Sequence, residues 1–249
     1  MTIALITGGS RGLGRNMAHH LAAKGTDIIF TYRTRKDEAD AVVADLALMG
    51  RKAVALQLDT GKIAEFDAFA AKVRETLKDW GRDDFDYLIN NAGIGLHTPF
   101  MQTTEAQFDE LMNIHVKGVF FLTQKLLPMI KDGGRILNLS TGLARFTYPG
   151  YAAYASMKGA VEVLTRYLAK ELGERRITVN VLAPGAIETD FGGGTLRDNA
   201  QVNAFVASQT ALGRTGLPDD IGGAVSVLLS DEAGWINGQR IEASGGQGL

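Results

Sequence analysis

The sequence has no cysteine among its 249 residues. Disulfides, thiolate metal sites and cysteine nucleophiles are therefore excluded together, and a reducing, cytoplasmic location is expected. No apolar run reaches the length of a membrane helix, since even the stretch VKGVFFLTQKLL is interrupted by Lys117 and Lys125. The opening MTIALITGG lacks the basic segment and cleavage site of a secretory signal and is typical of a buried strand.

An excess of charge of either sign is also lacking. Lys and Arg total 26 against 28 Asp and Glu, which gives a net charge of −2, and no dense basic run occurs. This balance argues against a nucleic-acid surface. We expect a small-molecule partner, no nucleic acid, no membrane and no metal site.

Short apolar runs alternate with helical stretches along the whole chain. Several runs are apolar at nearly every position, as in parallel strands covered by helices on both faces. This pattern predicts an α/β fold with a doubly wound parallel sheet, a Rossmann fold, in a single domain 1–249. A cofactor half is expected at about 1–140 and a catalytic and substrate half at about 141–249. The expected strands are residues 3–7, 27–32, 53–58, 87–90, 135–139, 177–183 and 241–243.

The glycine-rich stretch LITGGSRGLG follows the first expected strand. Ser10 lies in a G-x-S-x-G pattern, which is also the pattern of a hydrolase nucleophile. All four histidines fall in the first half of the chain, however, and none follows a late strand as that topology requires. Glycines that bring the backbone close to a ligand, at the start of a helix, favour a phosphate-binding turn instead. The residues expected there are Gly8, Ser10, Arg11, Gly12, Leu13 and Gly14.

Arginines follow the second expected strand, where a carboxylate would bind an adenosine ribose. Arg33 and Arg35 lie there, and Arg11 lies in the glycine turn. Guanidinium groups suit a 2′-phosphate, so NADP(H) is favoured over NAD(H).

Tyr154 and Lys158 are four residues apart in a long helical stretch, which places them on one face. At ~4 Å and an effective dielectric of ~20, an ammonium would stabilise a phenolate by roughly 4 kcal/mol. We therefore expect Lys158 to lower the pKa of Tyr154 towards neutrality, where a phenol can act as a general acid or base.

Taken in order, TGGSRGLG (7–14), NNAG (90–93), Tyr154 with Lys158, and the pair Pro184-Gly185 resemble the short-chain dehydrogenase/reductase superfamily over essentially the entire chain. The resemblance implies a nicotinamide-dependent oxidoreductase, usually a homotetramer or dimer. It implies that Tyr154 exchanges a proton with the substrate oxygen, and that Lys158 binds the nicotinamide ribose. It also assigns further cofactor contacts to Asp59, Thr60, Asn90, Ala92, Gly93, Pro184, Gly185, Ile187 and Thr189, although Asp59 and Thr189 also suit turn or capping roles.

Two positions depart from the pattern of that superfamily. The serine thirteen residues before the tyrosine is replaced by Thr141, with Ser140 just before it. Neighbouring strand residues face opposite ways, and we favour Thr141 as the hydroxyl that polarises the substrate oxygen. His115 occupies the place of an asparagine that takes part in a proton relay. It is either a relay with altered pH dependence or a packed helix residue.

The substrate side is expected to be mostly apolar. Residues 186–208 could close over it as a lid, with the glycines at 192–194 as a hinge. Apolar sides of the helical stretches 104–130 and 152–172 suit subunit pairing. The candidate pocket residues are His97, Leu143, Phe146, Tyr148, Tyr151 and Phe191.

These observations predict an NADP(H)-dependent carbonyl reductase or alcohol dehydrogenase, in which Tyr154, Lys158, Thr141 and His115 are the catalytic candidates. Two alternatives stay open at this point. One is a dinucleotide-binding or sensing protein that no longer catalyses turnover, and the other is a hydrolase that depends on Ser10.

Overall fold

The computed structural model describes all residues 1–249 and contains one seven-stranded parallel sheet. The strand order is β3-β2-β1-β4-β5-β6-β7, so the order reverses between β1 and β4. Loops on either side of such a reversal diverge and leave a crevice at the carboxyl edge of the sheet. The strands are β1 (Thr2–Ile6), β2 (Thr26–Tyr32), β3 (Ala53–Gln57), β4 (Phe85–Asn90), β5 (Ile130–Leu139), β6 (Thr178–Pro184) and β7 (Arg240–Ala243).

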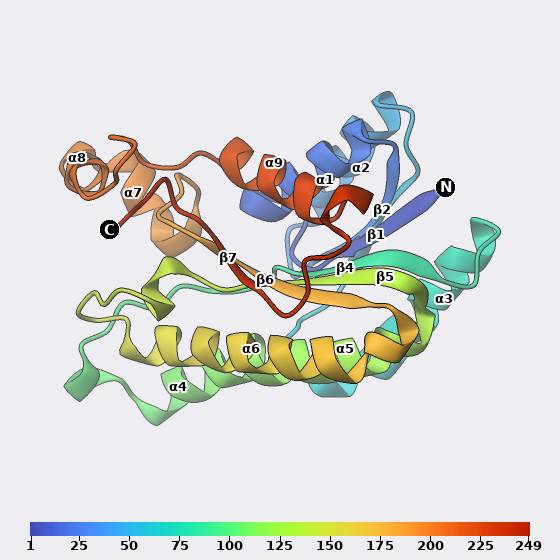
Figure 1. Ribbon diagram of the computed structural model, residues 1–249, viewed down its shortest axis with the longest axis horizontal. Coiled ribbons are helices and arrows are strands. Elements are labelled where there is room, and N and C mark those ends of the chain that lie inside the picture. Colours follow the sequence, from blue (N-terminus) through green and yellow to red (C-terminus); the bar gives the residue numbers. More distant parts are fainter.

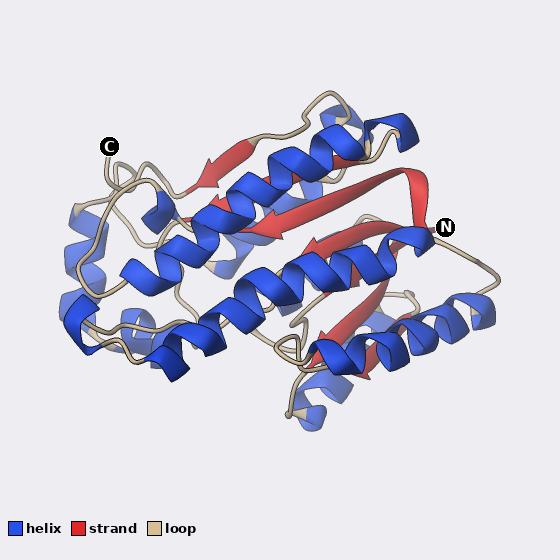
Figure 2. Cartoon of the chain, turned by 90° about the horizontal axis from the view of Figure 1, so that it is seen from below, coloured by secondary structure: helices blue, strands red, loops and turns tan.

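Helices cover both faces of the sheet, as Figure 1 shows. One layer holds α1 (Gly12–Ala23), α2 (Lys36–Leu48) and α9 (Pro218–Leu228). The other holds α3 (Phe66–Asp79), α4 (Glu105–Met112), α5 (Gly118–Leu126) and α6 (Ala152–Glu171), and Figure 2 views the molecule from this side. Two short helices, α7 (Thr195–Asp198) and α8 (Ala200–Ser208), stand beyond the carboxyl edge.

The strands are apolar on both faces because each face has its own core. Ile6, Phe30 and Ile89 pack against α1, α2 and α9, whereas Leu5, Ile29 and Leu88 pack against the opposite layer. Each of these six side chains is fully buried. This confirms the doubly wound parallel sheet that the sequence predicts. It also explains why the strands show continuous rather than alternating hydrophobicity.

The expected helical stretch 104–130 is not one continuous α-helix. A capping box of Thr104 and Gln107 starts α4, and a π-helical turn at Asn113–Lys117 separates it from α5. Such π-turns are rare and occur frequently at functional sites. This one carries His115 and turns its side chain into the protein interior.

No helix of the structure is long and apolar enough to cross a membrane.

Candidate active site

The glycine turn lies between the carboxyl end of β1 and the start of α1. Gly8 and Gly12 have φ angles of +68° and +52°, in the left-handed region that favours glycine. A side chain on Gly14 would overlap the carbonyl oxygen of Gly8, so the turn packs tightly on itself. The turn is fixed by Thr31, whose hydroxyl accepts a hydrogen bond from the Gly8 amide at 2.9 Å.

Helix α1 begins without a side-chain cap and has no acidic residue in its first turn. Its first amides and the positive end of its dipole are therefore directed at the crevice, an arrangement that suits an anion. Ser10, by contrast, forms no hydrogen bond to a histidine, so the arrangement of a hydrolase nucleophile is absent. The donor set of this turn fits a dinucleotide diphosphate.

The turn after β6 faces the glycine turn across the crevice. A side chain on Gly12 would approach the Cβ atom of Thr189 to 3.8 Å. Pro184 ends β6, and the amide of Gly185 donates to the carbonyl of Ala243 at 3.1 Å. The Thr189 hydroxyl accepts from the Phe191 amide at 3.2 Å, and Ile187 forms an isolated β-bridge with Gly216. The turns after β1 and β6 thus form the two walls of the crevice.

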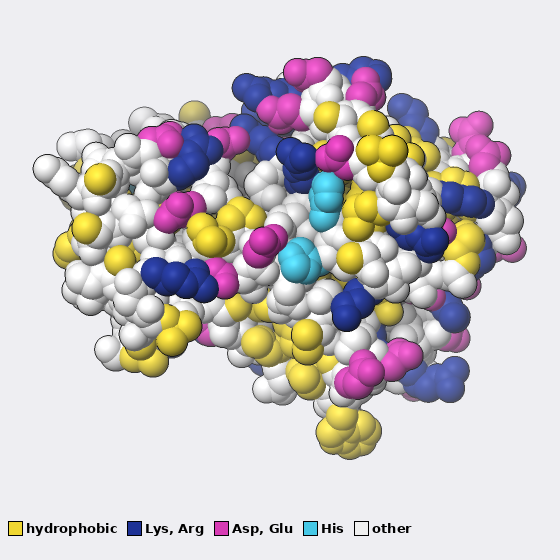
Figure 3. All heavy atoms as spheres, turned by 90° about the horizontal axis from the view of Figure 1, so that it is seen from above, with side chains coloured by type: hydrophobic (Ala, Val, Ile, Leu, Met, Phe, Trp, Pro, Cys, Tyr) yellow, Lys and Arg dark blue, Asp and Glu magenta, His cyan; other side chains and the backbone are white.

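A groove of about 550 Å³ extends from this crevice over the surface between α1 and α9. Gly12 and Thr189 line it, and half of its other lining residues are charged. Histidine side chains lie in the middle of this face, shown in cyan in Figure 3. His20 lies 3.3 Å from Asp219, and Arg15 pairs with Asp45 at 2.9 Å.

The three arginines expected near a 2′-phosphate differ in their partners. Arg35 is engaged by Glu38, and Arg11 lies 4.0 Å from Asp190. Arg33 is exposed at the end of β2 and forms no ion pair. Of the three, it is the one without an acidic partner.

Asn90 is placed differently from the expectation. Its amide nitrogen donates to the hydroxyl of Thr123 at 3.0 Å and to the side-chain oxygen of Asn138 at 2.8 Å. The side chain is thus buried beneath the sheet edge and does not line the crevice. The adjacent Asn91, which spacing alone did not single out, donates to the carbonyls of Thr7 and Gly8 at 2.8 and 3.1 Å.

The next segments along the crevice combine exposed and turn-forming residues. The Thr7 hydroxyl accepts from the Ala92 amide at 2.9 Å, and Gly93 is exposed beside it. The Asp59 carboxylate accepts from the Gly61 amide at 3.0 Å and so forms its own turn around Thr60. Asp59 is half-buried, which leaves its second carboxylate oxygen available to a ligand.

Tyr154 and Lys158 lie on the buried face of α6, one turn apart. The Lys158 ammonium donates to the Leu139 carbonyl at 2.8 Å and lies 5.8 Å from the centre of the Tyr154 ring. Burial lowers the pKa of Lys158 from 10.5 to about 8. The ammonium is therefore mostly protonated at pH 7, at a substantial desolvation cost.

The expectation that Lys158 lowers the pKa of Tyr154 is wrong for this structure. Burial raises the pKa of Tyr154 well above its usual value of 10, and the opposing effect is a side-chain hydrogen bond from Thr141. Burial is the dominant influence on the phenol, and the Lys158 ammonium makes its hydrogen bond to a main-chain carbonyl, 5.8 Å from the ring centre. The phenol therefore stays protonated at neutral pH.

The two candidate hydroxyls after β5 point to different partners. The Ser140 hydroxyl donates to the Glu162 carboxylate at 2.6 Å, whereas Thr141 interacts with the Tyr154 phenol. The oxygen of Thr141 also accepts from the Leu143 amide at 3.3 Å, which leaves its proton free to donate. Thr141 is thus the hydroxyl that lies beside the tyrosine.

His115 is fully buried and packs edge-on against Tyr154, with ring centres 5.3 Å apart. Its Nε2 atom donates to the Ile94 carbonyl at 2.9 Å, and its Nδ1 atom has no partner. Burial, with a smaller effect of the Lys158 charge, lowers the pKa of His115 to about 3. The imidazole is therefore neutral and presents an unpaired acceptor near the candidate site.

Further aromatic rings lie close to Tyr154. Tyr151 and Phe191 lie 6.5 and 5.9 Å from the Tyr154 ring, and His97 lies 4.9 Å from Tyr151. Leu143 and Tyr151 also pack against the small apolar cluster that contains Tyr154. The structure thus brings together four of the six expected pocket residues.

The other two expected pocket residues have different neighbours. Phe146 fills the space beside Gly142 and Gly248 instead of the pocket. Tyr148 is exposed and packs its ring on Phe205 of α8, a residue that the sequence did not indicate.

Residues 186–208, the segment expected to be a lid, contain three consecutive glycines in the left-handed region, with φ angles of +64°, +78° and +76° at Gly192, Gly193 and Gly194. Arg197 pairs with Asp190 and Asp198 across this turn. The three glycines therefore form a defined turn between β6 and α7, and the rest of the segment contains α7 and α8.

Comparisons with known proteins agree with this geometry. Residues 8–247 match the family model described as enoyl-(acyl carrier protein) reductase. The tetrahydroxynaphthalene reductase of Pestalotiopsis fici is 39% identical over 98% of this chain and 90% of its own length. An uncharacterised oxidoreductase of Methylorubrum extorquens is 35% identical, with 98% and 96% covered.

Solved structures also share this fold over nearly the whole chain. The angucycline C-6 ketoreductase LanV with bound NADP has a TM-score of 0.94 at 34% identity, covering 100% of this chain and 96% of that one. A blue fluorescent protein from a metagenomic library, in complex with NADPH, has a TM-score of 0.90 at 34% identity, with 98% and 97% covered. The fold, the crevice and these likenesses together show that the chain belongs to the short-chain dehydrogenase/reductase superfamily.

Proposed function

We propose that this protein reduces a carbonyl compound to an alcohol with NADPH, and that Tyr154 supplies the proton. The observation that carries the proposal is the buried, protonated Tyr154 phenol, which has the Thr141 hydroxyl beside it and Lys158 one turn away. NADPH, when bound, supplies the hydride. The chain itself must then bind the carbonyl oxygen, give it a proton and exclude water.

Tyr154 is suited to the role of general acid. A phenol whose pKa is raised by burial stays protonated at neutral pH and loses its proton only to a strongly basic oxygen, such as an alkoxide that forms on a reduced carbonyl. Thr141 donates a second hydrogen bond to the same oxygen and so stabilises its developing charge. Lys158 adds a positive charge 5.8 Å from the centre of the ring.

His115 acts in this proposal as a neutral acceptor. Because its pKa is about 3, the imidazole of His115 stays neutral between pH 5 and 9. Its Nδ1 atom is buried without a hydrogen-bond partner, and its ring supports Tyr154 from the side.

The proposed cofactor site runs along the crevice. The glycine turn and the start of α1 bind the diphosphate, and Arg33 binds the 2′-phosphate that distinguishes NADPH from NADH. The structures of relatives with NADP or NADPH support this assignment. The contacting residues we propose are Gly8, Ser10, Arg11, Gly12, Leu13, Gly14, Arg33, Asp59, Thr60, Ala92, Gly93, Tyr154, Lys158, Pro184, Gly185, Ile187 and Thr189.

We propose a fused-ring aromatic ketone as the substrate. Tyr151, Phe191 and His97 offer flat ring surfaces around Tyr154, on which a planar substrate can stack. Relatives named as reductases of tetrahydroxynaphthalene and of an angucycline support this class.

The deciding experiment measures NADPH oxidation by the wild-type protein and by Tyr154→Phe. The substrates are tetralone, cyclohexanone and an enoyl thioester. We expect turnover with tetralone, slower turnover with cyclohexanone, and loss of both in Tyr154→Phe with unchanged NADPH binding. Binding of NADPH without turnover of any substrate would instead support a sensing protein. Hydrolysis of an ester that is abolished by Ser10→Ala would support a hydrolase.

We further propose a homo-oligomer. Phe108 of α4 and Phe120 and Phe121 of α5 lie in the same helix layer and are each about 40% exposed. Exposed aromatic side chains are unfavourable in water, and a second subunit packed on this layer would bury them. The mass in size-exclusion chromatography with light scattering tests this proposal, and a monomer would contradict it.

A further inference from the structure

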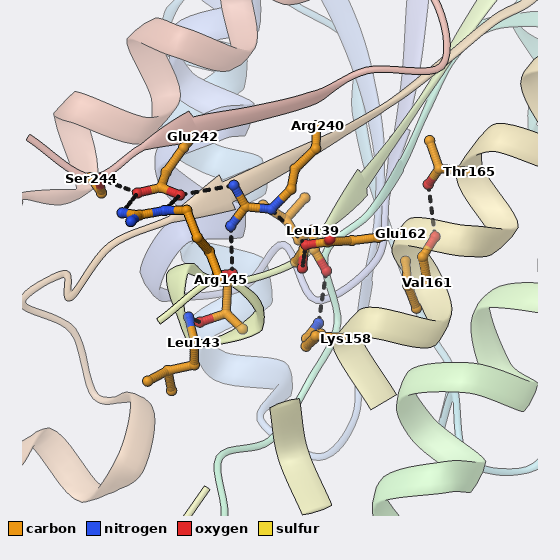
Figure 4. Close-up of polar contacts among 12 residues, drawn as sticks. Leu139, Leu143, Arg145, Lys158, Val161, Glu162, Thr165, Arg240, Glu242 and Ser244 are labelled. Atoms are coloured by element: carbon orange, nitrogen blue, oxygen red, sulfur yellow. Dashed lines mark hydrogen bonds and ion pairs between the residues drawn. The ribbon is translucent and has the colours of Figure 1, made fainter. Parts of the chain in front are cut away.

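A network of charged side chains joins the carboxyl end of β5 to α6 and β7. It comprises Glu162 on α6, Arg240 and Glu242 on β7, and Arg145 after β5, and Figure 4 shows it in close-up. Glu162 and Glu242 are only 14% and 17% exposed. The proton donation proposed above does not use any of these groups, although they directly adjoin Ser140 and Thr141.

Glu162 fixes the position of Ser140. It lies one turn beyond Lys158 on the same face of α6. One of its carboxylate oxygens accepts from the Ser140 hydroxyl at 2.6 Å and from Nε of Arg240 at 2.8 Å. The Ser140 amide in turn donates to the Leu182 carbonyl at 2.8 Å. The main-chain amide and the hydroxyl of Ser140 are therefore both fixed by hydrogen bonds, and the hydroxyl is directed at Glu162 and not at Tyr154.

Arg240 uses all three of its guanidinium nitrogens. Besides the bond to Glu162, Nη1 donates to Glu242 at 2.8 Å, and Nη2 donates to the main-chain carbonyl of Thr141 at 3.1 Å. Because the guanidinium is planar, two carboxylate bonds determine the direction of the third. Arg240 thus connects α6 rigidly to the main chain at Thr141.

Glu242 and Arg145 hold the guanidinium of Arg240 from the other side. Arg145 donates to both oxygens of Glu242, at 2.7 and 2.8 Å, and to the carbonyls of Gln247 and Gly248. These contacts hold the pKa of Glu242 at about 2, so its carboxylate stays charged. The network is therefore fully paired and extends from the C-terminal segment to the end of β5.

We infer that Arg240 and Glu162 are positioning residues that set the main chain at Ser140–Thr141, so that Thr141 rather than Ser140 presents its hydroxyl to Tyr154. This inference rests on the proposed function. Three consecutive residues at the end of β5 each form a hydrogen bond with a different side chain. The Leu139 carbonyl accepts from Lys158, the Ser140 hydroxyl donates to Glu162, and the Thr141 carbonyl accepts from Arg240. The tyrosine, the lysine and the glutamate come from successive turns of one helix, so the helix and the strand end are aligned residue by residue.

A similar arginine at the other end of β5 provides a matched control. Arg175 donates to Asp132 at 2.7 Å and to the carbonyls of Leu127 and Ile130, at the amino end of the strand. It therefore combines one carboxylate with main-chain acceptors, as Arg240 does. A purely structural role predicts the same consequences for the loss of either arginine.

The test is a double-mutant cycle on NADPH-dependent tetralone reduction with Arg240→Met, Thr141→Val and the double variant. We expect Thr141→Val to lower kcat about 100-fold and Arg240→Met about tenfold, with the dissociation constant for NADPH changed less than about twofold. If Arg240 acts through Thr141, the double variant should lie within about twofold of Thr141→Val. Arg240→Lys should recover part of the loss, and Arg175→Met should keep kcat within about twofold of wild type.

Amide hydrogen exchange gives a readout that does not depend on turnover. The peptide around residues 139–146 should exchange faster in Arg240→Met but not in Arg175→Met, because the Leu143 amide loses its fixed acceptor on Thr141. If Arg240→Met does not fold, Glu162→Gln, which keeps an acceptor for Ser140 but loses the charge, replaces it in the cycle.

The outcomes separate the two proposals. A wild-type protein that reduces no carbonyl compound overturns the proposed function. An active wild type whose kcat is insensitive to Arg240→Met, or a double variant that shows the product of the two single losses, overturns the positioning role alone. An equal loss of kcat in Arg175→Met would assign the effect to general stability.

Discussion

The two sides of the crevice use different physical means. On the side of β1 and β2 the predicted ligand contacts are mainly backbone, made possible by the left-handed glycines at Gly8 and Gly12 and by the uncapped start of α1. On the side of β5 and α6 the candidate groups are side chains whose ionisation is set by burial, foremost Tyr154 and Lys158. A backbone site can be predicted from the spacing of glycines, whereas a buried side-chain site depends on which atoms surround it.

The largest effect is expected on the side-chain part. Tyr154→Phe removes the proposed acid but keeps the ring that packs on His115 and Phe191. We expect kcat for tetralone reduction to fall by about 10³-fold, because general acid catalysis contributes about 10²–10⁴. Fluorescence titration should show unchanged NADPH binding. Retention of more than a tenth of wild-type turnover would remove Tyr154 from the role of acid.

A substitution at Gly14 disrupts the backbone side of the crevice most directly. Gly14→Ala places a methyl group against the carbonyl of Gly8, and the turn must open to relieve the overlap. We expect a loss of about 1–3 kcal/mol in stability from such overpacking, together with weaker NADPH binding. The matched control is Gly223→Ala, a helix glycine with no atom near its missing side chain, which should stabilise by about 0.5–1 kcal/mol. Equal melting temperatures for the two variants would contradict this view of the turn.

The two hydroxyls after β5 offer a finer comparison within the side-chain part. Thr141→Ala removes the donor beside Tyr154, whereas Ser140→Ala removes a hydroxyl that is bound to Glu162. We expect the first change to lower kcat about 100-fold, since loss of a single donor to an oxyanion costs about 10²–10³. Ser140→Ala should lower kcat clearly less than Thr141→Ala in steady-state kinetics. The reverse ranking would make Ser140 the group that polarises the substrate.

The smallest effect is expected at Arg33. Its side chain is exposed and forms no ion pair, so a contact with a phosphate there would be solvent-screened. Arg33→Ala should weaken NADPH binding about tenfold and leave NADH binding unchanged, because a charge-assisted bond contributes about 1.5 kcal/mol. Arg35→Ala is the control, since Arg35 is already paired with Glu38. Equal losses for NADPH and NADH would show that Arg33 does not recognise the 2′-phosphate.

The contrast between backbone and side-chain sites also explains which features could be predicted from the sequence. All seven strands, the glycine turn and the shared face of Tyr154 and Lys158 follow from local patterns and were predicted, and the structure confirms the fold. Asn90 was expected in the crevice, but its partners Thr123 and Asn138 come from other elements and turn its side chain inward. No local pattern contains those partners.

The electrostatics of the tyrosine could not be predicted for a related reason. Spacing correctly predicts that Lys158 lies one turn from Tyr154, but the direction of the ammonium depends on the Leu139 carbonyl of another element. The contact between Arg240 and Glu162 could not be predicted because the two residues are far apart in the sequence and meet only when β7 completes the sheet. The π-turn that buries His115 likewise has no signal in the hydrophobic pattern.

The central claim, that burial keeps Tyr154 protonated, is tested most directly by the pH dependence of kcat/KM for tetralone reduction. The Lys158 ammonium is present below a pKa of about 8 and is lost as the pH rises through it, so the wild-type rate should be level from pH 5 to 7 and fall near pH 8. The neutral His115 should add no step near its usual pKa of 6.5. In Lys158→Met the residual rate should stay level through the same range. A fall near neutral pH that persists in Lys158→Met would show that the phenol itself ionises there, and would contradict the account.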